Sequence, residues 1–222
     1  KSITMHKVVD TRITMRYAYG INREEGKVMK RFLVVLLSLV MALGLTAAGA
    51  EELKVGTNAE FPPFEYYGDD GSIQGFDAEL IAAIMALDST EFVIESMDFD
   101  ALPAALDAGK IDIAIAAMTI SEEKGKSVLF SKPYFQATQK LLVVEGSAIT
   151  SEADLAEGMK VGVQLGTTGD IYVTDNLLQV ETQRYNKALD AIWDLKNGRL
   201  DAVMVDAAPS QYFADSVGGL VV

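Results

Sequence analysis

LKVG at residues 53–56 recurs as MKVG at residues 159–162, and AGKID at residues 108–112 recurs as NGRLD at residues 197–201. In each copy the first motif opens a short apolar run, and the second comes after a segment with apolar residues at helical spacing. The spacings between copies, 106 and 89 residues, are too long and too unequal for a solenoid repeat. We therefore predict two similar α/β lobes. The alternative is that both motifs are simply common in α/β proteins.

Strand-like and helix-like segments alternate outward from these motifs, which is typical of an α/β fold with mainly parallel strands. In the first half we expect strands at 53–57, 92–95 and 111–116, helices at 76–87 and 101–108, and a short helix from Ser121. In the second half we expect a capped turn at 151–154, strands at 160–163, 181–185 and 202–205, and helices at 169–178, at 188–196 and from Ala207. The extended stretch at 140–144 would then cross between the lobes.

The expected organisation is a first lobe at 51–140, a hinge strand at 141–145 and a second lobe at 146–222. Two α/β lobes joined in this way face each other with the open ends of their sheets. Ligands of such sheets bind beyond the carboxyl ends of the strands. The residues directly after each strand are therefore the candidates for a binding cleft.

The N-terminal part reads as a secretory signal. Met29 is followed by the basic pair at 30–31, an apolar run at 32–45, and Ala48 and Ala50 as a small pair before a cleavage point. We expect residues 29–50 to be a signal peptide, residues 1–28 to be upstream or non-native, and the mature protein to be periplasmic or extracellular. The alternative is an uncleaved anchor, although the apolar run is short for a membrane span.

Composition excludes several classes of function. The net charge is −13, and residues 1–50 carry eight Lys or Arg against three acids, which leaves −18 for the remainder. So acidic a domain is a poor partner for nucleic acid or anionic lipid. The chain has no Cys, and its one His is His6, within the leader. Disulfides, thiolate or His-ligated metals and Ser-His-Asp catalysis are thereby excluded, so we expect a binding protein without metal or cofactor.

Residues after the strands of the first half offer an aromatic wall and a cation. Phe61 and Phe64 stand in a loop stiffened by two prolines, and one of them could face a ligand while the other packs inward. Ser121 is a candidate N-cap whose helix would point free N–H groups into the cleft, with Lys124 adding a positive charge. A carboxylate would be held there, whereas the alternative for Lys124 is a solvated surface cation.

Residues after the strands of the second half offer a second anion site and an acid. The run 166–169, GTTG, precedes the expected helix and lacks the Lys-Ser/Thr ending of a nucleotide-binding loop. Its members Thr167 and Thr168 would face the cleft. Asp206 comes directly after the last buried strand and could receive an ammonium group. The alternative for Asp206 is an N-cap of the next helix.

Seven groups of motifs occur in order along the chain: VGT and FPPFE within 55–65, GFD at 75–77, GKID at 109–112, MTISEE at 118–123, FSKPY at 130–134, VGVQLGTT at 161–168 and DAVMVD at 201–206. This ordered set resembles the polar amino-acid binding proteins of ABC importers, extracellular solute-binding proteins of family 3. The resemblance runs from Leu53 to the end of the chain. It implies a periplasmic-binding-protein-like fold, in which two α/β lobes close on a hinge around an amino acid.

The resemblance also implies roles for individual residues. Phe61 matches the aromatic position that packs on the ligand, and Phe99 matches a second side-chain contact. The α-carboxylate would be held by Thr119, Lys124 and Thr168, and the α-ammonium by Asp206. Ala117 matches a backbone contact, and Asn58 matches a position that tunes side-chain preference.

Two departures from the family pattern qualify the resemblance. The carboxylate position is usually Arg and is Lys124 here, which replaces a two-pronged fork by a point charge. Family members usually cross back after the position of Val222 and complete the first lobe, so we expect the second crossing and that completion to be missing from this sequence.

The predicted function is that of an ABC importer's substrate-binding component. It would act as a monomer that binds a small zwitterion by population shift between open and closed forms and passes it to a membrane permease. One alternative is a cyclohexadienyl or arogenate dehydratase-like enzyme, with Glu60, Glu65 or Asp206 as acids. Another is the ligand-sensing domain of a receptor. Asn58, Phe61 and Phe99 suggest a pocket that is neither strongly acidic nor strongly basic, and the sequence does not indicate which amino acid binds.

Overall fold

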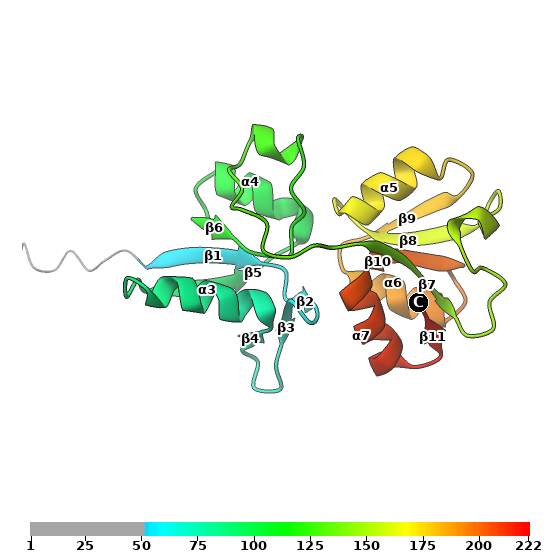
Figure 1. Ribbon diagram of the computed structural model, residues 1–222, viewed down its shortest axis with the longest axis horizontal. Coiled ribbons are helices and arrows are strands. Elements are labelled where there is room, and N and C mark those ends of the chain that lie inside the picture. The colour runs from blue at the N-terminus through cyan, green and yellow to red at the C-terminus, as the bar shows by residue number, and fades with distance from the viewer. Residues whose placement is uncertain (1–51) are drawn as a thin grey trace, which may run out of the picture. The chain divides into compact units, whose positions relative to one another are not determined.

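The computed structural model describes residues 52–222. The predicted signal peptide at 29–50 and the segment at 1–28 lie outside the described residues. Within the described part, no helix combines the length and the apolar character that a bilayer crossing requires. Two main sheets arise one after the other along the chain, each with its own helices (Figure 1).

The first sheet has three parallel strands in the order β5-β1-β6. Its strands are β1 (Leu53–Thr57), β5 (Phe92–Ser96) and β6 (Ile113–Ala114), and its helices are α3 (Phe76–Ala86) and α4 (Leu102–Asp107), with a 3₁₀ turn η1 (Phe99–Ala101) before α4. Val55 of β1 packs with Ile81 and Met85 of α3. On the other face, Leu102 packs with Ile111. The alternation of β1 therefore separates two small apolar clusters, one under each helix.

The second sheet has five strands in the order β11-β7-β10-β8-β9. Its elements are β7 (Gln139–Val144), β8 (Lys160–Gln164), α5 (Thr168–Asn176), β9 (Glu181–Tyr185), α6 (Ala188–Lys196), β10 (Ala202–Asp206), α7 (Ala207–Val217) and β11 (Leu220–Val221). Strands β8, β9 and β10 are parallel, whereas β7 runs antiparallel to β10. Val203 faces the cluster of α6 and α7, and Met204 faces the cluster of α5. Helices therefore cover both faces of this sheet too.

A small antiparallel sheet comes after β1 and carries aromatic residues. It consists of β2 (Glu60–Phe61), β3 (Glu65–Tyr67) and β4 (Ile73–Gln74), in that order. Phe61 and Phe64 pack into the same apolar cluster as Leu142, Ile192 and Val203 of the second sheet and its helices. This part of the first half therefore rests directly on the second half.

The repeated motifs make the same contacts in both halves. The Asp112 carboxylate accepts a hydrogen bond from Lys54 N at 2.8 Å, and the Asp201 carboxylate accepts one from Lys160 N at 2.7 Å. Each acid comes after a helix that ends at a glycine with positive φ, Gly109 or Gly198. The predicted equivalence of the motifs is thus confirmed at the level of hydrogen bonds.

The structure confirms some of the individual elements expected from the sequence and contradicts others. The helix expected from Ser121 is wrong, because the segment forms only the 3₁₀ turn η2 (Lys124–Lys126). The strand expected at 111–116 pairs only over β6.

The stretch at 141–145, predicted to be a hinge, lies mainly in β7, which pairs with β10 and β11 of the second sheet. The division into lobes stays a prediction. The turn expected at 151–154 forms as η3 (Glu152–Asp154), with Ser151 and Asp154 in a capping box.

Candidate functional site

All nine residues predicted from the sequence line one pocket. They are Asn58, Phe61, Phe99, Ala117, Thr119, Lys124, Thr167, Thr168 and Asp206, and the pocket is completed by Glu65, Ala116 and Gln164. The first six precede β7 and the last three come after β8, so both sheets contribute to it. Their convergence results from the carboxyl ends of parallel strands meeting at one edge of each sheet. Their contact with a ligand stays a prediction.

Aromatic side chains form one wall of the pocket. Phe61 in β2 and Phe99 in η1 are both buried, at 7% and 8% exposure, and both line the pocket. Phe64 stacks on Phe61 with ring centroids 6.3 Å apart, and it packs edge-on against Phe135. Of the two alternatives in this loop, Phe61 therefore faces the pocket and Phe64 packs inward.

Lys124 reaches across the pocket to the second half. Its backbone N–H donates to Ser121 Oγ at 3.2 Å, which holds the short turn η2. Its Nζ donates to Gly166 O at 3.0 Å and lies 5.7 Å from the centroid of the Phe99 ring. Burial lowers the pKa of Lys124, against a raising effect of Glu123. An ammonium has three N–H donors, so Lys124 keeps capacity for an anion in the pocket.

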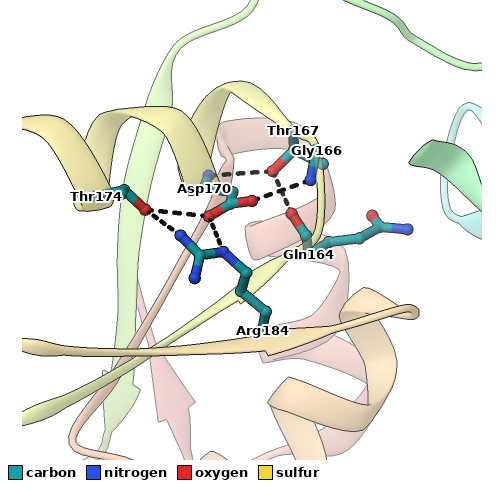
Figure 2. Close-up of polar contacts among 6 residues, drawn as sticks. All are labelled: Gln164, Gly166, Thr167, Asp170, Thr174 and Arg184. Carbon is teal, nitrogen blue, oxygen red and sulfur yellow. Dashed lines mark hydrogen bonds and ion pairs between the residues drawn. The ribbon is translucent and has the colours of Figure 1, made fainter.

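Thr167 and Thr168, between β8 and the first turn of α5, line the pocket. Figure 2 shows the polar contacts of this turn. Thr167 is the N-cap of α5, and its Oγ1 accepts from Asp170 N at 3.2 Å while donating to Gln164 O at 2.7 Å. Among residues 52–222, no acceptor is found for the N–H groups of Thr168 and Gly169. Free N–H groups and the positive end of a helix favour an anion at this place. Binding of an anion at this place stays a prediction.

Asp206 lies at the end of β10 and lines the pocket. It occupies the N-cap position of α7, but its side chain makes no capping hydrogen bond and instead accepts from Gln139 Nε2 at 2.6 Å. Burial raises the pKa of Asp206 to about 6, against the lowering effect of the Gln139 hydrogen bond. The capping alternative is therefore wrong, and the carboxylate remains ionised at neutral pH.

Amide and backbone groups fill the polar remainder of the pocket. Gln164 Nε2 donates to Asn58 Oδ1 at 2.9 Å, and Asn58 Nδ2 donates to Met97 O at 2.8 Å. Ala117 has a positive φ of 47°, and its N–H donates to Asp77 Oδ2 at 2.7 Å. That bond turns the Ala117 N–H away from any ligand and fixes the local chain path. Thr119 lines the pocket and is exposed to solvent.

Glu65 is the pocket acid to which sequence reasoning gave no binding role. It is 1% exposed, lines the pocket, and neither of its carboxyl oxygens meets an N–H or O–H donor among the described residues. Asp77, which is fully buried, lies close enough for its charge to raise the pKa of the Glu65 carboxyl. The sequence signal was a charged residue between two aromatic residues in a strand.

The environment of Glu65 favours its neutral form when the pocket is empty. Burial first, and then the charge of Asp77, raise the pKa of Glu65 to about 11. Burial also raises the pKa of Asp77, whose Oδ2 accepts from the Tyr134 hydroxyl at 2.9 Å. The charge of Asp206 acts on Glu65 in the same direction. Three acids therefore gather around a pocket whose lining holds one cation, Lys124.

Comparisons with known proteins agree with this geometry. Residues 53–205 match the family model of bacterial extracellular solute-binding proteins, family 3. The chain is 34% identical over 175 residues to ABC transporter arginine-binding protein 1 of Escherichia coli (strain K12), a match that covers 79% of this chain and 71% of that protein.

Solved structures share the fold. The arginine-bound form of truncated ArgBP from T. maritima matches with a TM-score of 0.73 and 42% identity, over 77% of this chain and 80% of that one. The ancestral amino acid-binding protein AncCDT-1, a precursor of cyclohexadienyl dehydratase, matches with a TM-score of 0.73 and 33% identity, over 77% of each chain. The predicted periplasmic-binding-protein-like α/β fold is confirmed, and the chain belongs to the bacterial extracellular solute-binding proteins of family 3.

Proposed function

We propose that this protein binds an amino acid with a cationic side chain, arginine before others, and delivers it to the membrane permease of an ABC importer. The choice of a cationic side chain rests on Glu65. This buried acid lines the pocket, and no hydrogen-bond donor reaches its carboxyl among the described residues. Separate groups of the pocket would hold the α-carboxylate, the α-ammonium and the side chain of the ligand.

The α-carboxylate would lie between Lys124 and the start of α5. Lys124 Nζ already bridges to Gly166 O, so the cation and the helix end face the same space. The N–H groups of Thr168 and Gly169 supply donors, and the Thr119 hydroxyl lies on the same pocket lining. A charge-assisted hydrogen bond of this kind contributes about 1.5 to 3 kcal/mol.

The α-ammonium would be held by Asp206. This carboxylate is ionised at neutral pH, lines the pocket, and is oriented by Gln139. The Lys124 and Asp206 charges together match a zwitterion, whose two charges are equal and opposite. Replacing either residue by Ala should weaken binding by more than about 1.5 kcal/mol, since a charged partner is lost from a buried site.

The ligand side chain would reach Glu65 along Phe61 and Phe99. A guanidinium is always charged, offers five N–H donors and stacks on aromatic faces. It would supply the donors that the Glu65 carboxyl lacks, and its charge would favour ionised Glu65. An apolar side chain would leave the buried Glu65 carboxyl without a hydrogen-bond donor.

The relatives support the same ligand class. The E. coli relative is an arginine-binding protein, and the T. maritima structure holds arginine. Both belong with proteins that bind rather than transform their ligands, which supports a non-enzymatic role here. Delivery to a permease, and location in the periplasm or outside the cell, are proposed from the family description.

Calorimetric titration with L-arginine and L-citrulline tests the proposal, because citrulline keeps the shape of arginine and replaces the guanidinium by an uncharged ureido group. Wild-type protein should bind arginine at least roughly tenfold more tightly than citrulline. Glu65→Gln should remove most of that preference, whereas Glu95→Gln, at an exposed acid on β5, should keep it. Equal affinities of the wild-type protein for the two ligands would contradict the cationic-ligand proposal.

A further inference from the structure

Asp170 does not line the pocket, but it holds the turn between β8 and α5 through a hydrogen bond to Gly166 (Figure 2). Its Oδ2 accepts from Gly166 N at 3.0 Å. The carbonyl of the same Gly166 accepts from Lys124 Nζ at 3.0 Å. The Gly166 residue is therefore held on both sides, by an acid of its own half at the N–H and by the cation of the other half at the carbonyl.

A residue with a side chain would be strained at position 166. Its φ of +75° lies in the region that favours glycine, and an added Cβ would approach Asp100 Cβ to 3.1 Å. The hydrogen bond from Gly166 N to Asp170 fixes the orientation of the turn relative to α5. The acceptor position for Lys124 thus depends on Asp170.

Arg184 of β9 lies behind Asp170 and pairs with it. Arg184 Nε donates to Asp170 Oδ1 at 2.8 Å, and Thr174 Oγ1 donates to the same oxygen at 3.2 Å. Arg184 also donates to Thr174 Oγ1 at 2.6 Å. The Asp170 side chain is 8% exposed and that of Arg184 is 43% exposed, so the acid is shielded and the cation covers it.

The charge of Asp170 would oppose the proposed ligand if it stood alone. Asp170 lies in the first turn of α5, the turn whose free N–H groups would bind the ligand carboxylate. Two negative charges that approach the same helix end repel each other, more strongly where water is excluded. The Arg184 guanidinium cancels that repulsion while leaving Asp170 able to accept from Gly166.

We propose that Asp170 and Arg184 form a positioning pair for the ligand's α-carboxylate: Asp170 orients the Gly166 peptide that receives Lys124, and Arg184 neutralises Asp170. The inference rests on the proposed function, because it presupposes a carboxylate at the start of α5. Neither residue touches the ligand. Their effect should therefore depend on whether the ligand has a carboxylate, and a purely structural pair would show no such dependence.

The test compares an amino acid with its decarboxylated amine. The wild-type protein is first titrated with L-arginine, L-histidine and L-glutamine, and the tightest of these is paired with agmatine, histamine or 4-aminobutanamide, respectively. Arg184→Met should weaken binding of the amino acid roughly tenfold, because Asp170 is left uncompensated. It should change binding of the amine less than about twofold, because the amine carries no anion for Asp170 to repel.

Two further variants separate charge from structure. Asp170→Asn keeps an oxygen that can accept from Gly166 N, so the double variant Asp170→Asn, Arg184→Met should recover most of the loss. Arg199→Met removes a comparable arginine from its pair with Asp194, where Nη1 and Oδ1 are 2.6 Å apart, and should leave both affinities unchanged.

The outcomes distinguish this inference from the function on which it rests. Equal loss of amino acid and amine in Arg184→Met would overturn the positioning pair while leaving the binding function intact. Failure of the double variant to recover affinity would overturn the charge argument. A wild-type protein that binds none of the three amino acids would contradict the proposed function itself, and this inference with it.

Discussion

The two halves of the molecule share a scaffold and differ in the segments that come after their first strands. Asp112 and Asp201 accept the same hydrogen bond from Lys54 and Lys160, respectively. Gly56 and Gly162 occupy equivalent positions, where an added Cβ would lie 2.4 Å from Ile111 Cδ1 in one half and 2.5 Å from Leu200 Cδ1 in the other. In each half, the apolar residue that follows the helix therefore packs closely over the strand glycine.

The chemistry of the pocket comes from the segments in which the halves differ. After β1 the chain forms a small antiparallel sheet that supplies Phe61 and Glu65. After β8 it turns directly into α5, which supplies free N–H groups. The same pattern of strands thus gives an aromatic and acidic wall on one side and an anion site on the other. The scaffold alone does not determine which group a half offers.

Truncating a core side chain in each half should give the largest change in the free energy of unfolding. Comparing the two variants shows whether the halves contribute equally to stability. Leu102→Ala and Leu142→Ala each remove a side chain that is fully buried, in α4 and β7 respectively. Each should lower the free energy of unfolding by about 2 to 5 kcal/mol. Leu142→Ala should cost more, because its apolar cluster is the larger of the two. Denaturant unfolding measures both, and a larger cost for Leu102→Ala would reverse the ranking.

Lowering the pH should weaken ligand binding, because it protonates Asp206 in the second half. Burial raises the pKa of Asp206 to about 6, and only the ionised carboxylate attracts an ammonium. In Glu65→Gln, where residue 65 can release no proton, affinity should be constant above pH 7 and fall as the pH drops through 6, by roughly tenfold at pH 5, because only about a tenth of the Asp206 sites remain ionised. Titration calorimetry between pH 5 and 8 measures this, with the double variant Glu65→Gln, Asp206→Asn as a control expected to be weak and nearly independent of pH. An unchanged affinity of Glu65→Gln at pH 5 would remove Asp206 from the ammonium site.

Asp112 and Asp201, the acids of the repeated motifs, should each contribute less to stability than the core leucines. Asp112→Ala and Asp201→Ala should each lower the free energy of unfolding by about 0.5 to 1.5 kcal/mol, because each removes the acceptor of one backbone N–H. Nearly equal costs are expected from the equal geometry. Thermal or denaturant unfolding measures the loss of stability in the two variants. If only one variant loses stability, the two motifs share a geometry but not an equal contribution to stability.

The exposed ion pair between Lys187 and Glu60 should contribute least to ligand affinity. Lys187, the N-cap residue of α6, pairs with Glu60 of β2, and Asn186 Nδ2 donates to Asp98 Oδ2 at 3.2 Å nearby. Lys187→Ala should weaken ligand binding less than about threefold, because exposed ion pairs are weak and screened by salt. The difference should vanish in about 1 M salt. Lys110→Ala, at an exposed lysine of the first half, serves as the control.

Most of the scaffold could be predicted because the decisive signals are local. The glycines at 109 and 198 end helices, and short apolar runs mark the strands β1, β8 and β10. Strand ends that meet at one edge, with ligands bound beyond that edge, were enough to predict Phe61, Lys124, Thr167, Thr168 and Asp206 as site residues. Asn58, Phe99, Ala117 and Thr119 were expected only from the resemblance to family members. The resemblance to family members then gave each residue its expected role.

The features that the sequence did not predict depend on contacts between distant segments. The segment from Ser121 carries a good N-cap residue, but the residues after it, up to Gly125 and Lys126, give a helix no apolar face to bury. The raised pKa of Glu65 depends on its burial and on the charges of Asp77 and Asp206, which no local pattern reveals. The hydrogen bond of Lys124 to Gly166 likewise joins residues 42 positions apart.

Burial raises the pKa of Glu65 to about 11, so this carboxyl carries a proton at neutral pH, and a guanidinium that binds Glu65 would displace that proton. At about pH 8 Asp206 is already ionised, so loading of the pocket should release about one proton to the solvent. The observed heat of loading would then vary with the ionisation enthalpy of the buffer, and Glu65→Gln would abolish that variation. Capture of the ligand would accordingly be favoured in alkaline surroundings and opposed in acidic ones.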